Sequence, residues 1–354
     1  MSKSGLFLVA ALAAANAHAG MVDLGSMMGG ANVFTVSDFT SSASDVEGAI
    51  VSGGDVTIDS YSVNEKNLAA FNEYSIAAGG DIKLSNGAIH YGRTYAGGKT
   101  TFDGAAAAPD ATDRPVDFSA ASRGFYDLSR ELSIVAATGT VDKVHDGVLV
   151  QGSGRGGVDV FHVSSDMMRD SVDWQLEGVM AGQTLIFNVS GERGVFGNGG
   201  ASFDPLAGYN VLFNFYEAKE VDVRGVIGTV LAPYAVMKAG VGSVKGNVVV
   251  DSWHSGVQVD AGHYFKPVDL AGFRDAPAAG KRAAKLSLAD MRNAVIPAAF
   301  TSVAYPPATN VPVSSMSDME LSSQAQPVAI PEPATLALVA TGLCALAWRY
   351  RRRA

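Results

Sequence analysis

Residues 50–58 read IVSGGDVTI, residues 76–84 read IAAGGDIKL and residues 94–102 read TYAGGKTTF, and this repeated unit decides the fold. In each unit, a Gly-Gly pair separates two short stretches in which apolar and polar residues tend to alternate. Alternation with a period of two is typical of β-strands, and glycine permits corners that a side chain would block. The second glycines of the pairs are 26 and then 18 residues apart: Gly54, Gly80 and Gly98. Each unit therefore predicts one coil that stacks its strands on the coil before it.

Short strands of the same kind recur through residues 32–265, each bounded by glycine, asparagine or aspartate. With 40 glycines and 47% hydrophobic residues, the composition excludes a wholly disordered chain. We predict a mainly β fold whose head, residues 31–265, is β-solenoid-like or β-helix-like. Hairpins in an ordinary β-sandwich are the alternative, because three units of unequal spacing also fit that fold.

One helix interrupts the strands and is predicted to lie against the side of the β-structure. The apolar residues of its face follow each other at steps of three, four and three: Phe125, Leu128, Leu132 and Val135. Asp117 or Ser119 can cap its start, and Gly139 can end it.

Residues 1–19 have the three parts of a secretory signal peptide. Lys3 supplies a positive charge, residues 6–15 are apolar, and Ala17 and Ala19 occupy the small positions of a cleavage pattern. We expect signal peptidase to cut between Ala19 and Gly20, which predicts an exported protein.

Residues 266–330 differ from the head in composition. They lose the strand alternation and contain seven of the 13 prolines, together with many alanines and serines. Such a composition is typical of linkers, so we predict a disordered stalk here.

Residues 331–354 combine an extended triplet, an apolar run and a basic cluster. Pro331, Glu332 and Pro333 precede the uncharged residues 334–348, and arginines follow at Arg349, Arg351, Arg352 and Arg353. This pattern predicts a transmembrane helix over residues 334–348 whose last residues stay in the cytoplasm. Fifteen residues span about 22 Å, short of a hydrocarbon core of about 30 Å, so the helix would be a weak permanent anchor.

This ending resembles the PEP-CTERM sorting signal of Gram-negative bacteria, which has the same triplet, helix and terminal arginines in that order. The resemblance implies that the chain is the substrate of an exosortase, a membrane protease, which removes the tail near the triplet. It also implies a transient stay in the inner membrane, and then a location at the cell surface or in the extracellular matrix.

The head resembles the choice-of-anchor A family, which occurs with different surface anchors. The matching segments are residues 44–64, 136–141 and 209–265, with GTVLAP at residues 228–233 among the most specific pieces. The chain departs from the family at Tyr216 and Tyr234, where proline and asparagine are frequent. The resemblance implies a β-solenoid-like adhesive head, and it carries over no catalytic residue.

The charge of the chain argues against a nucleic-acid partner. The sequence has 26 basic and 35 acidic residues, a net charge of −9. Removal of both ends would leave 21 basic and 34 acidic residues, a net charge of about −13. Binding to the phosphates of a nucleic acid requires a basic face instead. The one cysteine, Cys344, lies in the tail, so the exported protein is predicted to contain no disulfide.

Residue spacing reveals no catalytic or metal motif, and we predict neither a cofactor nor a metal. Gly98, Lys99 and Thr100 are like the end of a phosphate-binding loop, but Arg93 stands where that motif requires glycine. Asp55 and Asp81 follow their Gly-Gly pairs and could stack to hold calcium. The alternative, which we favour, is that each accepts a hydrogen bond from a nearby backbone amide in a turn.

The predicted function is non-enzymatic adhesion to extracellular polysaccharide or another surface ligand. Five tyrosines could stack on sugar rings if they shared a face, or could instead cover strand edges: Tyr61, Tyr74, Tyr91, Tyr95 and Tyr126. An enzyme acting on extracellular polysaccharide is one alternative and requires paired carboxylates in a cleft. An ice- or mineral-binding solenoid is another and requires regular ranks of one residue type, whereas Thr57, Lys83 and Thr101 are mixed.

Overall fold

The computed structural model describes residues 19–106, 108–171, 173–196 and 203–273, which belong to the first of two compact units, residues 1–294. These residues form strands with a few helices, which confirms the mainly β prediction. Among the helices in these ranges, none is long and apolar enough to cross a membrane. The predicted transmembrane helix and most of the predicted stalk lie outside the described residues.

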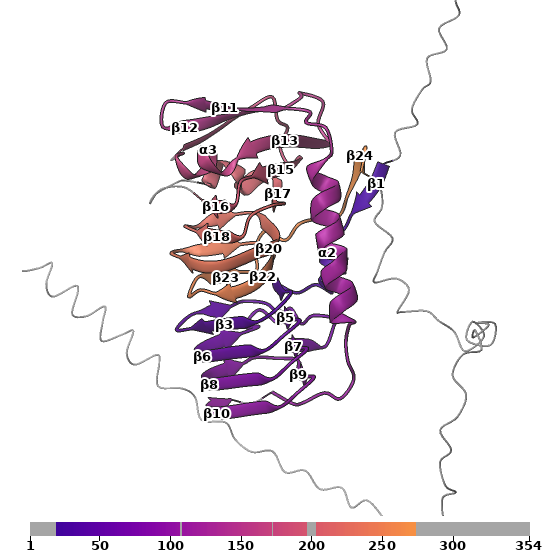
Figure 1. Ribbon diagram of the computed structural model, residues 1–354, viewed down its shortest axis with the longest axis vertical. Helices are drawn as coiled ribbons and strands as arrows, with labels where there is room; N and C mark the ends of the chain where they lie inside the picture. Colours follow the sequence, from indigo (N-terminus) through magenta and orange to yellow (C-terminus); the bar gives the residue numbers. More distant parts are fainter. Residues whose placement is uncertain (1–18, 107, 172, 197–202, 274–354) are drawn as a thin grey trace, which may run out of the picture. The chain divides into compact units, whose positions relative to one another are not determined.

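Parallel strands stack in three columns, and the chain runs through the columns in turn to form coils (Figure 1). The first column contains β13 (Val158–Ser164), β15 (Thr184–Ser190), β17 (Asn210–Phe215), the start of β20 (Thr229–Gly240), the start of β22 (Val248–His254), β2 (Val33–Thr35), β5 (Ile50–Ser52), β7 (Tyr74–Ala78) and β9 (Arg93–Ala96). The second contains β16 (Arg193–Val195), β18 (Glu220–Val223), the ends of β20 and β22, β3 (Phe39–Ser42), β6 (Val56–Val63), β8 (Ile82–Ile89) and β10 (Thr100–Ala106). The third contains β19 (Val226–Ile227), β21 (Ser243–Lys245), β23 (Gln258–Asp260), β4 (Asp45–Val46) and the ends of β6, β8 and β10.

The coils do not follow one another in simple sequence order. The N-terminal coils run from β2 in the middle of the stack to β10 at one end, and the C-terminal coils return from the other end (Figure 1). The last coil therefore stacks on the first, with Val248 beside Val33 and Trp253 beside Phe39. Buried asparagines on either side seal this junction, because Asn32 donates to the Gly246 carbonyl and Asn247 donates to the Ala31 carbonyl, both at 2.8 Å.

Glycine is required at the corner between the first two columns. A Cβ atom on Gly53 would lie 2.1 Å from the Val36 carbonyl oxygen, and one on Gly79 would lie 2.2 Å from the Gly53 oxygen. The same contact recurs in the next coil, where Gly97 lies over Gly79. The Gly-Gly repeat in the sequence thus reflects close backbone contact between successive coils.

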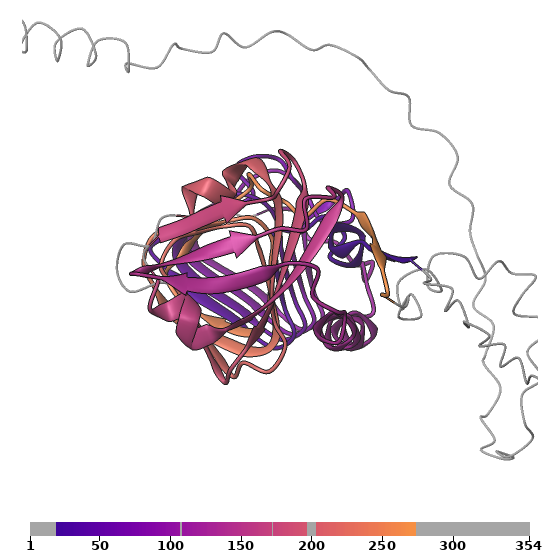
Figure 2. The same cartoon turned by 90° about the horizontal axis from the view of Figure 1, so that it is seen from above.

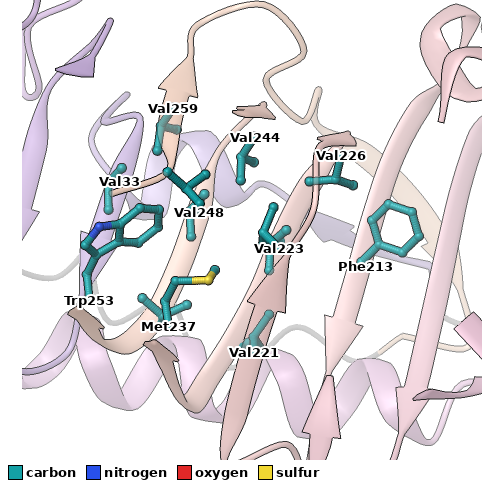
Figure 3. Packing of buried hydrophobic residues seen from close by; sticks show 14 of the residues in the cluster. Val33, Phe213, Val221, Val223, Val226, Met237, Val244, Val248, Trp253 and Val259 are labelled. Atoms are coloured by element: carbon teal, nitrogen blue, oxygen red, sulfur yellow. The ribbon is translucent and has the colours of Figure 1, made fainter. Parts of the chain in front are cut away.

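The core lies between the columns, and alternation along the strands fills it. In β6, Val56 and Ile58 are buried whereas Thr57 and Asp59 are exposed. Figure 3 shows inward side chains of several coils, with Trp253 and Met237 among the valines. Nearer the end formed by β13, aromatic rings replace the valines: Phe161, Phe187 and Phe213 stack at centroid distances of 5.0 and 5.1 Å.

Smaller elements cover the end of the stack at β13. A three-stranded sheet comprises β11 (Thr140–Val144), β12 (Gly147–Gln151) and β14 (Asp173–Glu177). The helix α3 (Ser165–Arg169) follows β13, and the 3-10 helix η1 (Asp204–Gly208) precedes β17. Figure 1 places the sheet beyond β13.

A separate strand pair joins the two ends of the described chain. β1 (Ala19–Val22) pairs antiparallel with β24 (Val268–Ala271), and α1 (Leu24–Met27) follows β1. Val22, Leu24 and Leu270 are all buried. The sequence predicted that a linker begins after residue 265. The packed part of the chain extends further, because Leu270 of β24 is buried together with Val22 and Leu24.

The helix α2 (Phe118–Ser133) lies beside the columns, and Figure 2 shows it end-on. Asp117 caps it by accepting a hydrogen bond from the Ala120 amide, as one of the two predicted caps. The predicted face is buried at Phe125, Leu128 and Leu132, where it meets the outward side chains of the first column. The helix ends at Ser133 rather than near Gly139, because the amides of residues 138 and 139 donate to the Val160 carbonyl of β13.

A polar ladder fixes the C-terminal half of α2 to three coils. His162, Asn188 and Asn214 lie side by side on β13, β15 and β17. Their side chains donate to the carbonyls of residues 135, 132 and 129, at 2.9, 2.7 and 2.9 Å. Between residues 129 and 132 the helix rises about 4.5 Å, close to the spacing of about 4.8 Å between neighbouring strands, and residue 135 lies just beyond the end of the helix.

Replacement of Asn214 by alanine is expected to weaken this docking. Asn214 is fully buried, donates to Asn188 at 2.8 Å and accepts from the Ser129 hydroxyl at 2.6 Å. Loss of these partners should lower the free energy of unfolding by about 2 kcal/mol. Urea unfolding measures this change, with the exposed Gln175→Ala as control. Equal urea midpoints for the two variants would mean that the hydrogen bonds of Asn214 contribute nothing to stability.

Candidate functional site

The aspartates at the corners between the first two columns form a structural ladder: Asp38 follows Val36 and Ser37, and Asp55 and Asp81 follow Gly-Gly pairs. The Oδ1 atoms of Asp38, Asp55 and Asp81 accept hydrogen bonds from the backbone amides of Asp55, Asp81 and Lys99, at 2.8, 2.8 and 2.7 Å. Each carboxylate therefore accepts from a backbone amide, as favoured, but the amide belongs to the next coil and not to the aspartate's own turn. Within the described ranges, no group of three or more histidine, cysteine, aspartate or glutamate side chains is placed to hold a metal ion.

The outer side of the second column carries two polar ranks, which we call the polar face. One rank contains Thr40, Thr57, Lys83 and Thr101, and the other contains Ser42, Asp59, Ser85 and Asp103. All are exposed except the half-buried Ser85. Successive members are about 4.8 Å apart because they stand on neighbouring strands. The face is regular in position but mixed in chemistry, as the sequence indicated for Thr57, Lys83 and Thr101.

The five tyrosines considered for sugar stacking do not share a face. Tyr61 and Tyr74 are buried, and Tyr95 stacks on Phe118 of α2 at 6.3 Å. Tyr91 is 59% exposed. Of the five, Tyr126 stacks on another tyrosine: the centroid of its ring lies 4.7 Å from that of Tyr234.

An acidic pocket of about 550 Å³ opens beside the third column. Asp45, Glu47 and Glu65 line it together with Gln258 of the last coil. The pKa of Asp45 is raised, first because burial disfavours the carboxylate and then because Glu65, Asp260 and Glu47 are close. A carboxyl group with a raised pKa can act as a general acid. Asp45 and Glu47 stand beside the end of β6, which leads to Glu65, whereas the stacking of the last coil on the first brings Gln258 to the pocket.

The residues predicted for processing lie mostly outside the described part of the chain. This holds for Ala17, for Pro331, Glu332 and Pro333, and for Arg349, Arg351, Arg352 and Arg353. Ala19 and Gly20 are described and begin β1, where they pair with Ala271 and Leu270. Cleavage between them stays a prediction, and it would leave Gly20 as the first residue of the strand.

Comparison with protein families gives two matches. The model described as "Putative Ice-binding-like adhesive domain" matches residues 26–261, more than half of the chain. The model of the PEP-CTERM protein-sorting motif matches residues 329–353. No curated protein and no solved structure matches the chain. The second match includes the predicted triplet and arginines, and the first is compatible with the resemblance to the choice-of-anchor A family.

Proposed function

The chain belongs to the ice-binding-like adhesive domain family and carries a PEP-CTERM sorting motif, and from this premise we propose that it is an adhesin of a Gram-negative cell surface or extracellular matrix. The single observation that carries the proposal is the order of the two matches in one chain, with the adhesive domain before the sorting motif. The combination supports an exported surface protein. Its head is a β-solenoid that binds extracellular polysaccharide or another surface ligand without turning it over.

The route to the surface follows from the two ends of the chain. Signal peptidase removes residues 1–19, and the helix predicted from the sequence at residues 334–348 then holds the protein in the inner membrane. The prolines of the triplet keep residues 331–333 out of helical geometry, so an exosortase can reach this backbone. Cleavage near the triplet releases the head with the segment that follows it.

Replacement of both Pro331 and Glu332 by alanine is expected to abolish release. The variant should accumulate at full length in the membrane fraction, because the exosortase no longer recognises the triplet. Immunoblots of membrane and released fractions, in a bacterium that contains an exosortase, measure the effect. Pro327→Ala is the control, since it changes a nearby proline outside the motif. Release of the double variant at the rate of the unmodified chain would refute processing at this motif.

The polar face offers a surface for adhesion. Its two ranks extend over four coils and present hydroxyl, carboxylate and ammonium groups to the solvent. Lys83 interrupts the threonines of one rank, and serine alternates with aspartate in the other. Mixed donors and acceptors favour a hydrated biological partner over ice or a mineral, which call for repetition of one group.

The acidic pocket favours a second candidate function, an enzyme acting on extracellular polysaccharide. Asp45 has the raised pKa that a general acid needs, and Glu47 and Glu65 lie in the same pocket. Assay of the purified exported protein against soluble polysaccharides separates the two functions. Turnover that disappears in Asp45→Asn would establish the enzyme, whereas binding without turnover supports the adhesin.

A further inference from the structure

A second pocket, of about 400 Å³, opens where three successive coils turn from the first column to the second. It lies after β15, after β17 and within β20. Its lining consists of Gly191, Glu192, Tyr216, Glu217, Lys219 and Tyr234. Neither the polar face nor the acidic pocket shares any of these residues.

Tyr234 presents a fixed aromatic surface in this pocket. Tyr126 of α2 stacks on its ring at a centroid distance of 4.7 Å and an angle of 26°. The Lys219 Nζ atom lies over the same ring, 5.5 Å from its centroid. Lys219 lines the pocket and Tyr126 does not, so Tyr126 supports the ring from behind while the exposed lysine lies on the pocket side.

Tyr216 supplies a second ring and a hydroxyl group. The ring is half-buried in the pocket lining. The pKa of its hydroxyl is raised, mainly because burial disfavours the phenolate and also because Glu217 is close. The hydroxyl therefore stays protonated and can donate a hydrogen bond. Two tyrosines thus combine flat apolar area with polar rims, which suits a ligand that has both.

The charges around the rings select against ionic ligands. Glu192 and Glu217 are both exposed at the pocket and would repel a uronate, sulfate or phosphate group. Lys219 occupies the position over Tyr234 that a ligand cation would take, and would repel it. A neutral ligand with many hydroxyl groups avoids both conflicts and can use the carboxylates and the ammonium as hydrogen-bond partners.

The pocket is built on a fixed backbone. The Gly191 amide donates to Glu217 Oε1 at 2.6 Å, and the Lys219 amide donates to the Glu192 carbonyl at 2.7 Å. The Val236 amide donates to the Lys219 carbonyl at 2.9 Å and ties the loop to β20. Gly191 has a φ of +118°, and a Cβ atom there would lie 2.2 Å from the Ser165 hydroxyl. Such pre-organisation reduces the entropy lost on binding.

We propose that this tyrosine pocket binds a neutral pyranose unit of an extracellular polysaccharide. The apolar face of the sugar ring lies against Tyr234 and displaces the exposed Lys219 ammonium to the rim. Its hydroxyl groups then bond to Lys219, Glu192 and Tyr216. The inference deepens the proposed adhesive function, on which it rests, by naming a ligand class and the residues that select it.

Glycan binding by the purified exported protein tests the proposal. The probes are neutral hexose oligosaccharides, oligosaccharides of uronic acids, and choline, each followed by ligand-detected NMR titration. We expect binding of neutral oligosaccharides, weaker binding of uronates and no binding of choline. Tyr234→Ala and Tyr216→Ala should each weaken the neutral ligand about tenfold, since ring stacking accounts for much of the affinity.

Two further variants show whether a loss of binding comes from the missing ring or from a misfolded protein. Tyr234→Phe retains the ring and should bind within about twofold of the unmodified protein, because stacking does not need the hydroxyl. Tyr91→Ala removes an exposed tyrosine outside the pocket and should bind unchanged. Preference for uronates or choline, or full affinity in a folded Tyr234→Ala variant, would overturn the assignment. If no neutral glycan binds while the tail is still processed, the pocket proposal fails and surface sorting stands.

Discussion

Replacement of Gly79 by alanine is expected to lower the free energy of unfolding by about 3 kcal/mol or more. The new Cβ atom would lie 2.2 Å from the Gly53 carbonyl oxygen, which is backbone and cannot rotate away. Relief requires the two coils to separate at the corner. This movement would lengthen the hydrogen bond from the Gly79 amide to the Ser52 carbonyl, now 2.8 Å. Urea unfolding followed by circular dichroism measures the loss.

Gly262→Ala is the matched control for this substitution. A Cβ atom at Gly262 would have no heavy atom within 4 Å, so the change should stay within about 0.5 kcal/mol. Similar stability of both variants would mean that the corner can open without cost. The Gly-Gly repeat would then have no steric origin.

Replacement of Phe213 by alanine should cost about 3–5 kcal/mol, because it removes the centre of an aromatic cluster. Phe213 is fully buried and stacks on Phe187 at 5.1 Å. The edges of further rings meet it at 5.1 to 6.1 Å: Phe196, Trp174 and Phe203. These neighbours belong to several elements, so the cavity cannot close by the movement of one side chain. Thermal and urea unfolding both report the loss.

Ile134→Ala is the control for the aromatic cluster, since that side chain is 74% exposed at the end of α2. It should change the free energy of unfolding by less than about 0.5 kcal/mol. Phe213→Leu tests the reason for the loss, because a smaller cavity should give an intermediate value. A Phe213→Ala variant as stable as Ile134→Ala would rule out the cluster as a main source of stability.

Local patterns in the sequence were sufficient to predict the Gly-Gly corners and the helix α2. The repeated Gly-Gly pairs indicated coils because their cause acts at every turn: the first glycine of each pair lies against the backbone of the coil before it, and the second against an aspartate of that coil. Asp117 and the apolar face starting at Phe125 indicated α2 for a similar reason, since capping and amphipathicity act within a few residues.

Pairing across long separations left no such signal. Nothing near Val33 indicates that Val248 is its neighbour, because both strands have the same short apolar pattern as many others. The acidic pocket depends on this juxtaposition in part, because it brings Gln258 of the last coil beside Asp45 of the first. Tyr126 could be noted as a candidate, but its partner Tyr234 stands more than 100 positions later and is brought near only when α2 docks.

The pair of β1 with β24 gives the molecule a defined response to mechanical pull. β24 is the last strand of the described residues, and Phe273 beyond it is buried in the same apolar cluster as Leu270, so tension from the C-terminal side acts first on Phe273. The pair of Ala271 with Ala19 is next, and the tension then reaches the following pairs of the two strands in order, towards Val22. Because these two strands form a sheet of their own, tension on the C-terminal end of the described chain can separate them while the stacked coils keep their pairing.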